Sequence, residues 1–132
     1  RAFIMMYKTI LHATDLQSNH FDLCTKALQL AKYHHATLHL LHVMEVPASF
    51  QVAQNLGFAE LAIPAQDDVQ IVMKTLAEAL GLPATQTHVE VGAVDYHILE
   101  KAKALSCELI ILGSSQGHLL KQAPCDVLIL HT

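Results

Sequence analysis

The sequence predicts a single doubly wound α/β domain: a five-stranded parallel sheet in the order 3-2-1-4-5, with helices on both faces. Three observations predict it. Short apolar runs alternate with segments whose apolar residues recur at helical spacing. The strand–helix–strand units are long enough for right-handed crossovers, which make successive strands parallel. Hydrophobic residues make up 52% of the 132 residues, which suits a sheet covered on both faces.

The first predicted strand ends on Asp15. Ligands bind at the carboxyl ends of the central strands in open parallel sheets, so this carboxylate is a candidate binding group. It could instead only accept hydrogen bonds from the N-terminal amides of the next helix, and both interpretations stay open. Met6 is the expected natural start, so residues 1–5 are expected to be a remnant outside the domain, which would span residues 6–132.

A helix is predicted from about Asn19 to His34, with Ser18 as its cap and a core face at helical spacing: Phe21, Cys24, Ala27, Leu28 and Ala31. Residues 36–43 form the second strand. The pattern weakens over residues 44–64, a stretch long enough that we expect it to be functional or to hold a short helix.

The second half of the chain repeats the alternation. A helix over about 65–80 has the apolar stripe Val69, Val72, Met73, Leu76 and Leu80. Residues 85–91 alternate as a half-exposed strand near the sheet edge. A helix over about 94–105 follows, with the predicted core residues Val94, Ile98, Ala102 and Leu105. A fully buried strand over 108–112 ends on a turn at 113–117, and the end of a helix at 119–123 leads to the last strand, Cys125 to Leu130.

The predicted strand order reverses between the first and fourth strands. Asp15 and the turn from Gly113 to Gly117 should therefore face each other across a crevice. The turn could present backbone amides and the hydroxyls of Ser114 and Ser115 to an anion. A plain tight turn would use the same residues, and neither a G-x-G-x-x-G motif nor a P-loop lysine is present, so both interpretations remain open.

Composition excludes several classes of function. The net charge of −4 and the absence of a Lys/Arg block argue against nucleic-acid partners. No apolar run approaches the roughly 18 residues of a membrane span, so no membrane partner is expected. Cys24, Cys107 and Cys125 are far apart and without a C-x-x-C, which predicts free thiols and a reduced, cytoplasmic setting.

Ten histidines raise the question of a metal site. His39 and His42 are the strongest pair, but residues three apart on a strand point to opposite faces, so no metal site is predicted. No G-x-S-x-G elbow occurs, and no catalytic residue is predicted.

The chain resembles the universal stress protein family (a UspA-like domain) from Met6 onward. The resemblance is carried by the order and spacing of several pieces: residues 7–11 with Thr14-Asp15-Leu16, residues 36–43, Gly92 with the helix through Ile98 and Ala102, residues 108–114, and residues 123–129. It implies a small cytoplasmic stress-response protein that forms homodimers through its last strand, Cys125 to Leu130, and has further protein partners of unknown identity.

Some members of the family bind ATP with a motif of Gly, two residues, Gly, nine residues, then Gly-Ser or Gly-Thr. The resemblance implies that Gly113 matches the first glycine of this motif. It also implies that Asp15 and Val43 match two further residues that contact the nucleotide in those members. Together with the crevice, this gives the candidate cofactor-binding set Ala13, Asp15, Val43, Gly113, Ser114, Gln116 and Gly117, with ATP as the candidate cofactor and no other.

The chain departs from this motif. Gln116 stands where the second glycine would be, no Gly-Ser or Gly-Thr follows nine residues later, and the segment between Gln116 and Leu119 is shorter than the family usually has. Either the phosphate loop has been lost, or part of it is missing from the sequence, and we favour the second alternative.

Three functions compete. The first is a dimeric stress-response protein that acts by ligand occupancy or protein interaction, without turnover. The second is an ATP-binding member with slow hydrolysis or none, against which Gln116 argues. The third is a flavodoxin-like or nucleotide-α-hydrolase-like enzyme, which only the shared topology supports.

Overall fold

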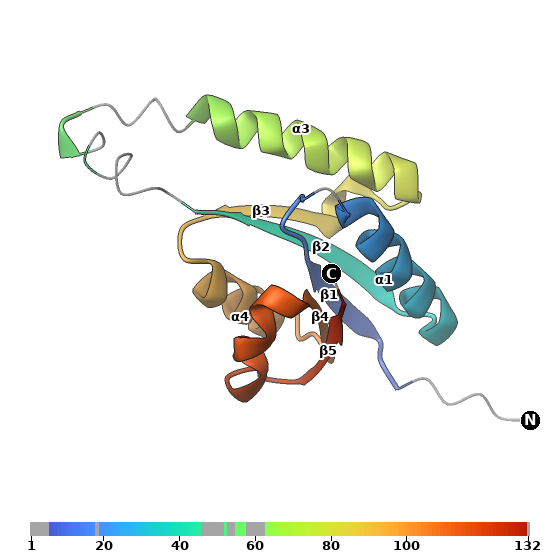
Figure 1. The fold of residues 1–132 in the computed structure, drawn as a ribbon. Coiled ribbons are helices and arrows are strands. Elements are labelled where there is room, and N and C mark those ends of the chain that lie inside the picture. Colours follow the sequence, from blue (N-terminus) through green and yellow to red (C-terminus); the bar gives the residue numbers. More distant parts are fainter. Residues whose placement is uncertain (1–5, 18, 46–51, 53–54, 58–62, 132) are drawn as a thin grey trace, which may run out of the picture.

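The computed structural model describes residues 6–17, 19–45, 52, 55–57 and 63–131 (Figure 1). Strands and helices alternate along the chain in this order: β1 (Thr9–Ala13), α1 (His20–His34), β2 (Thr37–Met44), α3 (Ile63–Leu80), the 3-10 helix η2 (Ala84–Gln86), β3 (Thr87–Val91), α4 (Val94–Ala104), β4 (Leu109–Gly113), the 3-10 helix η3 (Ser114–Lys121) and β5 (Asp126–Leu130).

The strands form one parallel sheet in the order β3-β2-β1-β4-β5. β1 pairs with both β2 and β4, Ile10 lying opposite Leu38 on one side and Leu109 on the other. The chain thus adds β2 and β3 on one side of β1, and then crosses to the other side of β1 to add β4 and β5. The predicted fold class and strand order are confirmed.

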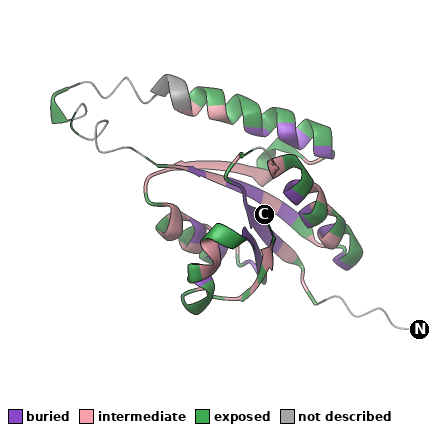
Figure 2. Cartoon of the chain, in the orientation of Figure 1, coloured by how far each residue is buried: buried purple, intermediate pink, exposed green. Residues whose placement is uncertain are grey.

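The core lies in two layers, one on each face of the sheet. Alternate residues of β1 point to opposite faces, as strand geometry requires. Ile10 packs with Cys24 of α1 and Met73 of α3 in one cluster, and Leu11 packs with Ile98 of α4 and Leu119 of η3 in the other. Figure 1 shows α1 and α3 on one side of the sheet and α4 with η3 on the other, and Figure 2 shows the buried residues concentrated on the central strands.

Two residues of the predicted helix faces are not buried. Phe21 is 46% exposed and Val72 is 44% exposed, whereas Leu23 and Ala77 are buried in their helices. The buried positions of α3 include Met73 and Ala77, and Val72 lies one residue, or about 100° of helix rotation, away from Met73. Phe21 is in phase with the stripe of α1 but lies in its first turn. Both predictions of burial were wrong for a geometric reason, since the sheet covers only part of each apolar stripe.

The predicted turn at 113–117 is also absent. Gly113 is the last residue of β4, paired with Leu130, and residues 114–121 continue directly as η3. Gly113 has an extended backbone with φ −79°, and Gly117 is not among the described glycines with positive φ. The glycines therefore do not use their special conformational freedom, and the predicted helix end at 119–123 is replaced by a 3-10 helix that ends at Lys121.

The start of α1 differs slightly from its prediction. The N-cap is Asn19, which makes no side-chain capping hydrogen bond, and the predicted cap, Ser18, lies outside the described residues, as do residues 1–5. Most of the segment between Met44 and Ile63 also lies outside them, so its predicted short helix or functional loop stays a prediction.

Candidate ligand-binding site

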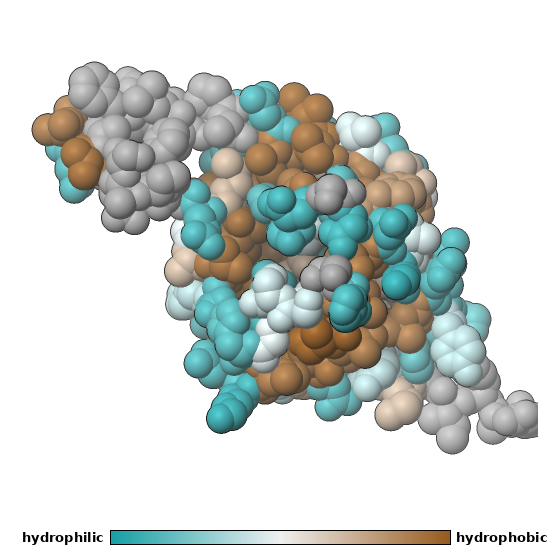
Figure 3. All heavy atoms as spheres, in the orientation of Figure 1, coloured by the Kyte–Doolittle hydropathy of each residue, from teal (hydrophilic) through white to brown (hydrophobic). Residues whose placement is uncertain are grey.

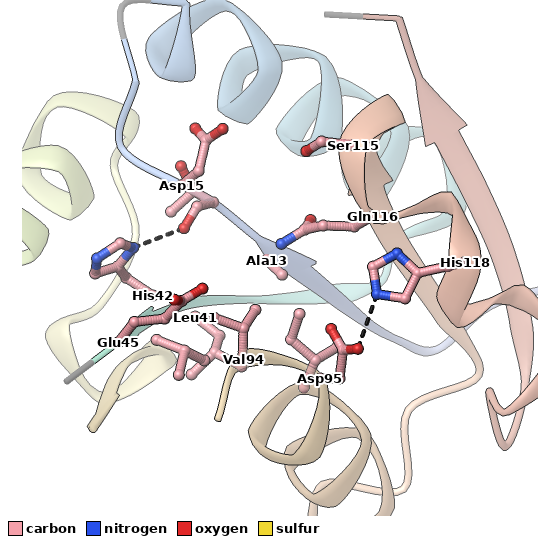
Figure 4. Close-up of a pocket in the computed structure, with 13 residues that line it drawn as sticks. Ala13, Asp15, Leu41, His42, Glu45, Val94, Asp95, Ser115, Gln116 and His118 are labelled. Atoms are coloured by element: carbon pink, nitrogen blue, oxygen red, sulfur yellow. Dashed lines mark hydrogen bonds and ion pairs between the residues drawn. The ribbon is translucent and has the colours of Figure 1, made fainter. Parts of the chain in front are cut away.

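A pocket of about 360 Å³ lies at the carboxyl ends of the two central strands β1 and β2 (Figure 4). The residues that follow these strands form one side of it, and α4 and η3 form the other. This is the switch point of the sheet, because the chain adds β2 and β3 on one side of β1 and β4 and β5 on the other. The described residues lining it are Ala13, Thr14, Asp15, Leu41, His42, Val43, Glu45, Val94, Asp95, Ile98, Ser115, Gln116 and His118.

The pocket brings together part of the predicted set. Ala13, Asp15, Val43 and Gln116 all line it, and they come from β1, the loop after it, β2 and η3. In Figure 4 the amide of Gln116 points across the pocket toward Ala13. The other predicted residues, Gly113, Ser114 and Gly117, lie on the same β4–η3 segment but are not among the described lining residues, whereas Ser115 is.

Asp15 belongs to the loop between β1 and α1. Its Oδ1 accepts a hydrogen bond of 2.9 Å from the backbone N–H of Gln17, and Leu16 between them has a positive φ of 57°. Gln17 precedes the first turn of α1, which begins at His20. This contact shapes the loop and does not cap the helix, and the carboxylate stays exposed at the edge of the pocket.

Four titratable lining residues were missed by the sequence analysis. His42 on β2 donates from Nδ1 to the backbone oxygen of Thr14, at 2.8 Å, and so ties β2 to the loop after β1. Asp95 in the first turn of α4 lies 2.8 Å, from Oδ2 to Nε2, from His118 of η3. Glu45 follows β2 directly. The available signal was position, because His42 lies near the carboxyl end of β2 and the other three residues follow the ends of strands, as Asp15 does.

The charge and polarity of the pocket are uneven. Its apolar walls come from Leu41 and Val43 of β2 and from Val94 and Ile98 of α4. Carboxylates and imidazoles lie around them, and no Lys or Arg is among the described lining residues. The pocket thus combines apolar walls with convergent polar groups, as sites for small organic ligands do.

A pair of histidines lies away from the pocket. Nδ1 of His39 on β2 is 2.9 Å from Nε2 of His88 on β3, so one ring donates and the other accepts. Burial lowers the pKa of both imidazoles, that of His88 to about 4, and the nearby Lys101 ammonium acts in the same direction. Among the described residues no group of three or more His, Cys, Asp or Glu side chains is placed to hold a metal ion.

The three cysteines are free thiols. Burial raises the pKa of Cys24 to about 11 and that of Cys107 to about 12, so both are poor nucleophiles at neutral pH. No helix in the described part of the chain combines the length and the apolar character needed to cross a bilayer.

Known proteins are similar to this chain in sequence. The universal stress protein family model matches residues 6–131. Universal stress protein A homolog 1 of Coxiella burnetii is 26% identical, with 94% of this chain and 96% of the relative covered. Homolog 2 of the same organism is 30% identical, with 92% and 93% covered.

Solved structures show the same fold. Universal stress protein UspA from Lactobacillus plantarum superposes with a TM-score of 0.65 at 22% identity, covering 94% of this chain and 97% of its own. A universal stress protein in complex with cAMP superposes with a TM-score of 0.67 at 20% identity, covering 96% and 98%. With a family model that matches residues 6–131 and relatives that match over more than nine tenths of both chains, this chain belongs to the universal stress protein family.

Proposed function

We propose that this protein is a stress-response protein that works without catalytic turnover, by binding an adenosine-containing ligand in the pocket at the switch point. One observation carries the proposal. Asp15, Val43 and Gln116, which are far apart in the sequence, line a single pocket at the end of the sheet where ligands of doubly wound folds bind.

The shape and chemistry of the pocket suit a nucleoside. The aliphatic walls at Leu41, Val43 and Ile98 can cover the faces of a heterocycle. The carboxylates and the amide of Gln116 can hydrogen-bond a base and a ribose. A universal stress protein of the same fold has been solved with cAMP, an adenine nucleotide, which supports this class of ligand.

Binding without turnover is favoured over ATP hydrolysis. A hydrolytic site needs groups that hold the γ-phosphate and orient the attacking water, usually a lysine, a glycine-rich loop and a metal ion. Gln116 occupies the place of the second motif glycine, and the segment around it is the 3-10 helix η3. The second candidate function is an ATP-binding protein with slow hydrolysis, which would use the same binding residues Asp15 and Val43. The two functions can be distinguished because only hydrolysis releases phosphate.

The proposed working form is a cytoplasmic homodimer joined through the last strand, from Cys125 to Leu130. β5 lies at one edge of the sheet, beside β4 alone, and the side chain of Leu128 on it is 38% exposed. An edge strand with exposed apolar residues presents unpaired backbone groups to a second copy. Ligand occupancy would then be communicated to further protein partners.

Calorimetric titration tests the proposal. The protein, with its mass verified, is titrated with adenosine, cAMP and ATP with Mg²⁺, and phosphate release is followed in parallel. We expect at least one of these ligands to bind with micromolar affinity at about one site per chain, without phosphate release above the rate in buffer. No heat of binding with any ligand at about 1 mM would contradict the proposed function.

A further inference from the structure

The carboxylates of the pocket come from three separate segments. Asp15 follows β1, Glu45 follows β2 and Asp95 lies in the first turn of α4. They belong to the described lining residues, among which there is no Lys or Arg to balance them. Of the two lining histidines, His118 is held by Asp95 at 2.8 Å, and His42 is hydrogen-bonded to the backbone oxygen of Thr14.

Binding of a nucleoside polyphosphate requires compensation of its charge. Proteins supply it with lysine or arginine side chains, with backbone amides of glycine-rich loops or with a metal ion. Here the segment that could serve this purpose is η3, whose residues 115 and 116 line the pocket. Asp95 lines the same pocket and is paired with His118, two residues further along η3 (Figure 4). An anion bound at this part of η3 would therefore share the pocket with the carboxylate of Asp95.

We propose that this pocket selects its ligand by charge, and that it accepts an uncharged nucleoside in preference to a nucleoside polyphosphate, with Asp95 as a specificity-determining residue. The proposal rests on the proposed function and names the ligand class of that site. A nucleoside brings hydrogen-bond donors, which the carboxylates can accept, and no phosphate that they would repel. A singly charged nucleotide such as cAMP should fall between the two.

The side chain of Asp95 is 49% exposed and that of His118 is 58% exposed, so replacing the carboxylate by an amide leaves the core untouched. Asp95→Asn keeps the shape of the side chain and removes its charge. Asp22→Asn is the matched control, because Asp22 is an exposed carboxylate in the first turn of α1 and does not line the pocket.

The test is calorimetric titration of the wild-type protein and both variants with adenosine, cAMP and ATP, in EDTA and then with Mg²⁺. In EDTA we expect the wild type to bind adenosine about tenfold more tightly than ATP, with cAMP between them, and the gap to narrow with Mg²⁺ or with added salt. Asp95→Asn should shift the ratio of ATP to adenosine affinity about fivefold toward ATP, and Asp22→Asn should leave this ratio as it is.

Three other outcomes would each overturn a part of this proposal or the proposed function itself. Wild-type affinity for ATP in EDTA equal to or above that for adenosine overturns selection by charge and leaves the proposed function standing. A wild-type preference for adenosine that Asp95→Asn does not change removes Asp95 as the specificity-determining residue. No binding of adenosine, cAMP or ATP by any of the three proteins contradicts the proposed function itself, and the inference with it.

Discussion

Asp95 Oδ2 lies 2.8 Å from Nε2 of His118, so a side chain of α4 and one of η3 meet beside the pocket at the switch point. The pair is exposed, and its contribution to stability is therefore small, at most about 1 kcal/mol. Its importance lies in position, because it places a carboxylate in the pocket, where a donor or a cation would favour a phosphate group. The predictions below follow from this pocket and from the layers that support it.

Asp15→Ala should weaken binding of an adenosine-containing ligand without unfolding the protein. The exposed carboxylate accepts one loop hydrogen bond, from Gln17, whose loss costs about 1 kcal/mol. We expect affinity to fall about tenfold, or about 1.4 kcal/mol, by calorimetry. Asp22→Ala, on the outside of α1, serves as the control. Unchanged affinity in Asp15→Ala would remove this residue from the site.

The His39–His88 pair should make the protein less stable in mild acid. Burial lowers the pKa of both imidazoles, that of His88 to about 4, while an unfolded histidine titrates near 6.5. Between these values the unfolded chain binds more protons than the folded one, so the free energy of unfolding falls as pH decreases from about 6.5 to about 4. Urea unfolding at several pH values measures this slope.

The matched variants separate this pair from other acid effects. The buried His12, whose pKa burial also lowers, contributes in the same direction in every variant that keeps it. His88→Val should reduce the slope, because valine suits a half-buried strand and does not titrate. His131→Gln, an exposed residue after β5, should keep the wild-type slope. Equal slopes in all three proteins would exclude the His39–His88 pair as their source.

Leu128→Glu should convert the proposed dimer to a monomer in light scattering. The side chain is 38% exposed on the edge strand β5, so a charge there disrupts an interface and leaves the core intact, whereas the neighbouring Ile129 packs into the core. Ile71→Glu is the control, as it places the same charge on α3, where Ile71 is 61% exposed. A dimeric Leu128→Glu protein would contradict an interface at β5.

Met73→Ala and Val72→Ala should differ sharply although they are neighbours on α3. Met73 is 1% exposed, and truncating such a side chain costs about 2–5 kcal/mol through lost burial and a cavity. Val72 is 44% exposed in a groove between α1 and α3, and Figure 3 shows hydrophobic surface over α3. Its truncation should cost less than about 0.5 kcal/mol. If urea unfolding showed that the two variants lose similar amounts of stability, the buried face of α3 would be misassigned.

The sequence predicts the fold well because buried parallel strands are nearly continuous apolar runs. β4, with Leu109, Ile110, Ile111 and Leu112, contains no polar residue, and the crossover rule then restricts the strand order. The helix faces are predicted less well, since periodicity gives the direction of a stripe and not the width that the sheet covers. Val72, for example, belongs to the apolar stripe of α3 but lies outside the part of that stripe that is buried.

The site is predictable where topology alone determines proximity. Asp15 and Gln116 follow β1 and β4, adjacent strands, so their approach follows from the strand order. Asp95 and His118 follow β3 and β4, but this position alone did not identify them. A single charged residue in the first turn of an amphipathic helix has the same pattern whether it faces solvent or a pocket. The 3-10 helix η3 was missed for a related reason, as glycine permits a turn without requiring one.

The central claim is that an adenosine-containing ligand occupies the pocket at the switch point. Titrating isotope-labelled protein with adenosine while recording backbone amide NMR spectra tests it most directly. We expect the largest shifts at Ala13, Asp15, Val43 and Gln116, with Asp95 among them. Shifts confined to the groove between α1 and α3, around His20 and Ile71, would place the ligand on the opposite face of the sheet and contradict the claim.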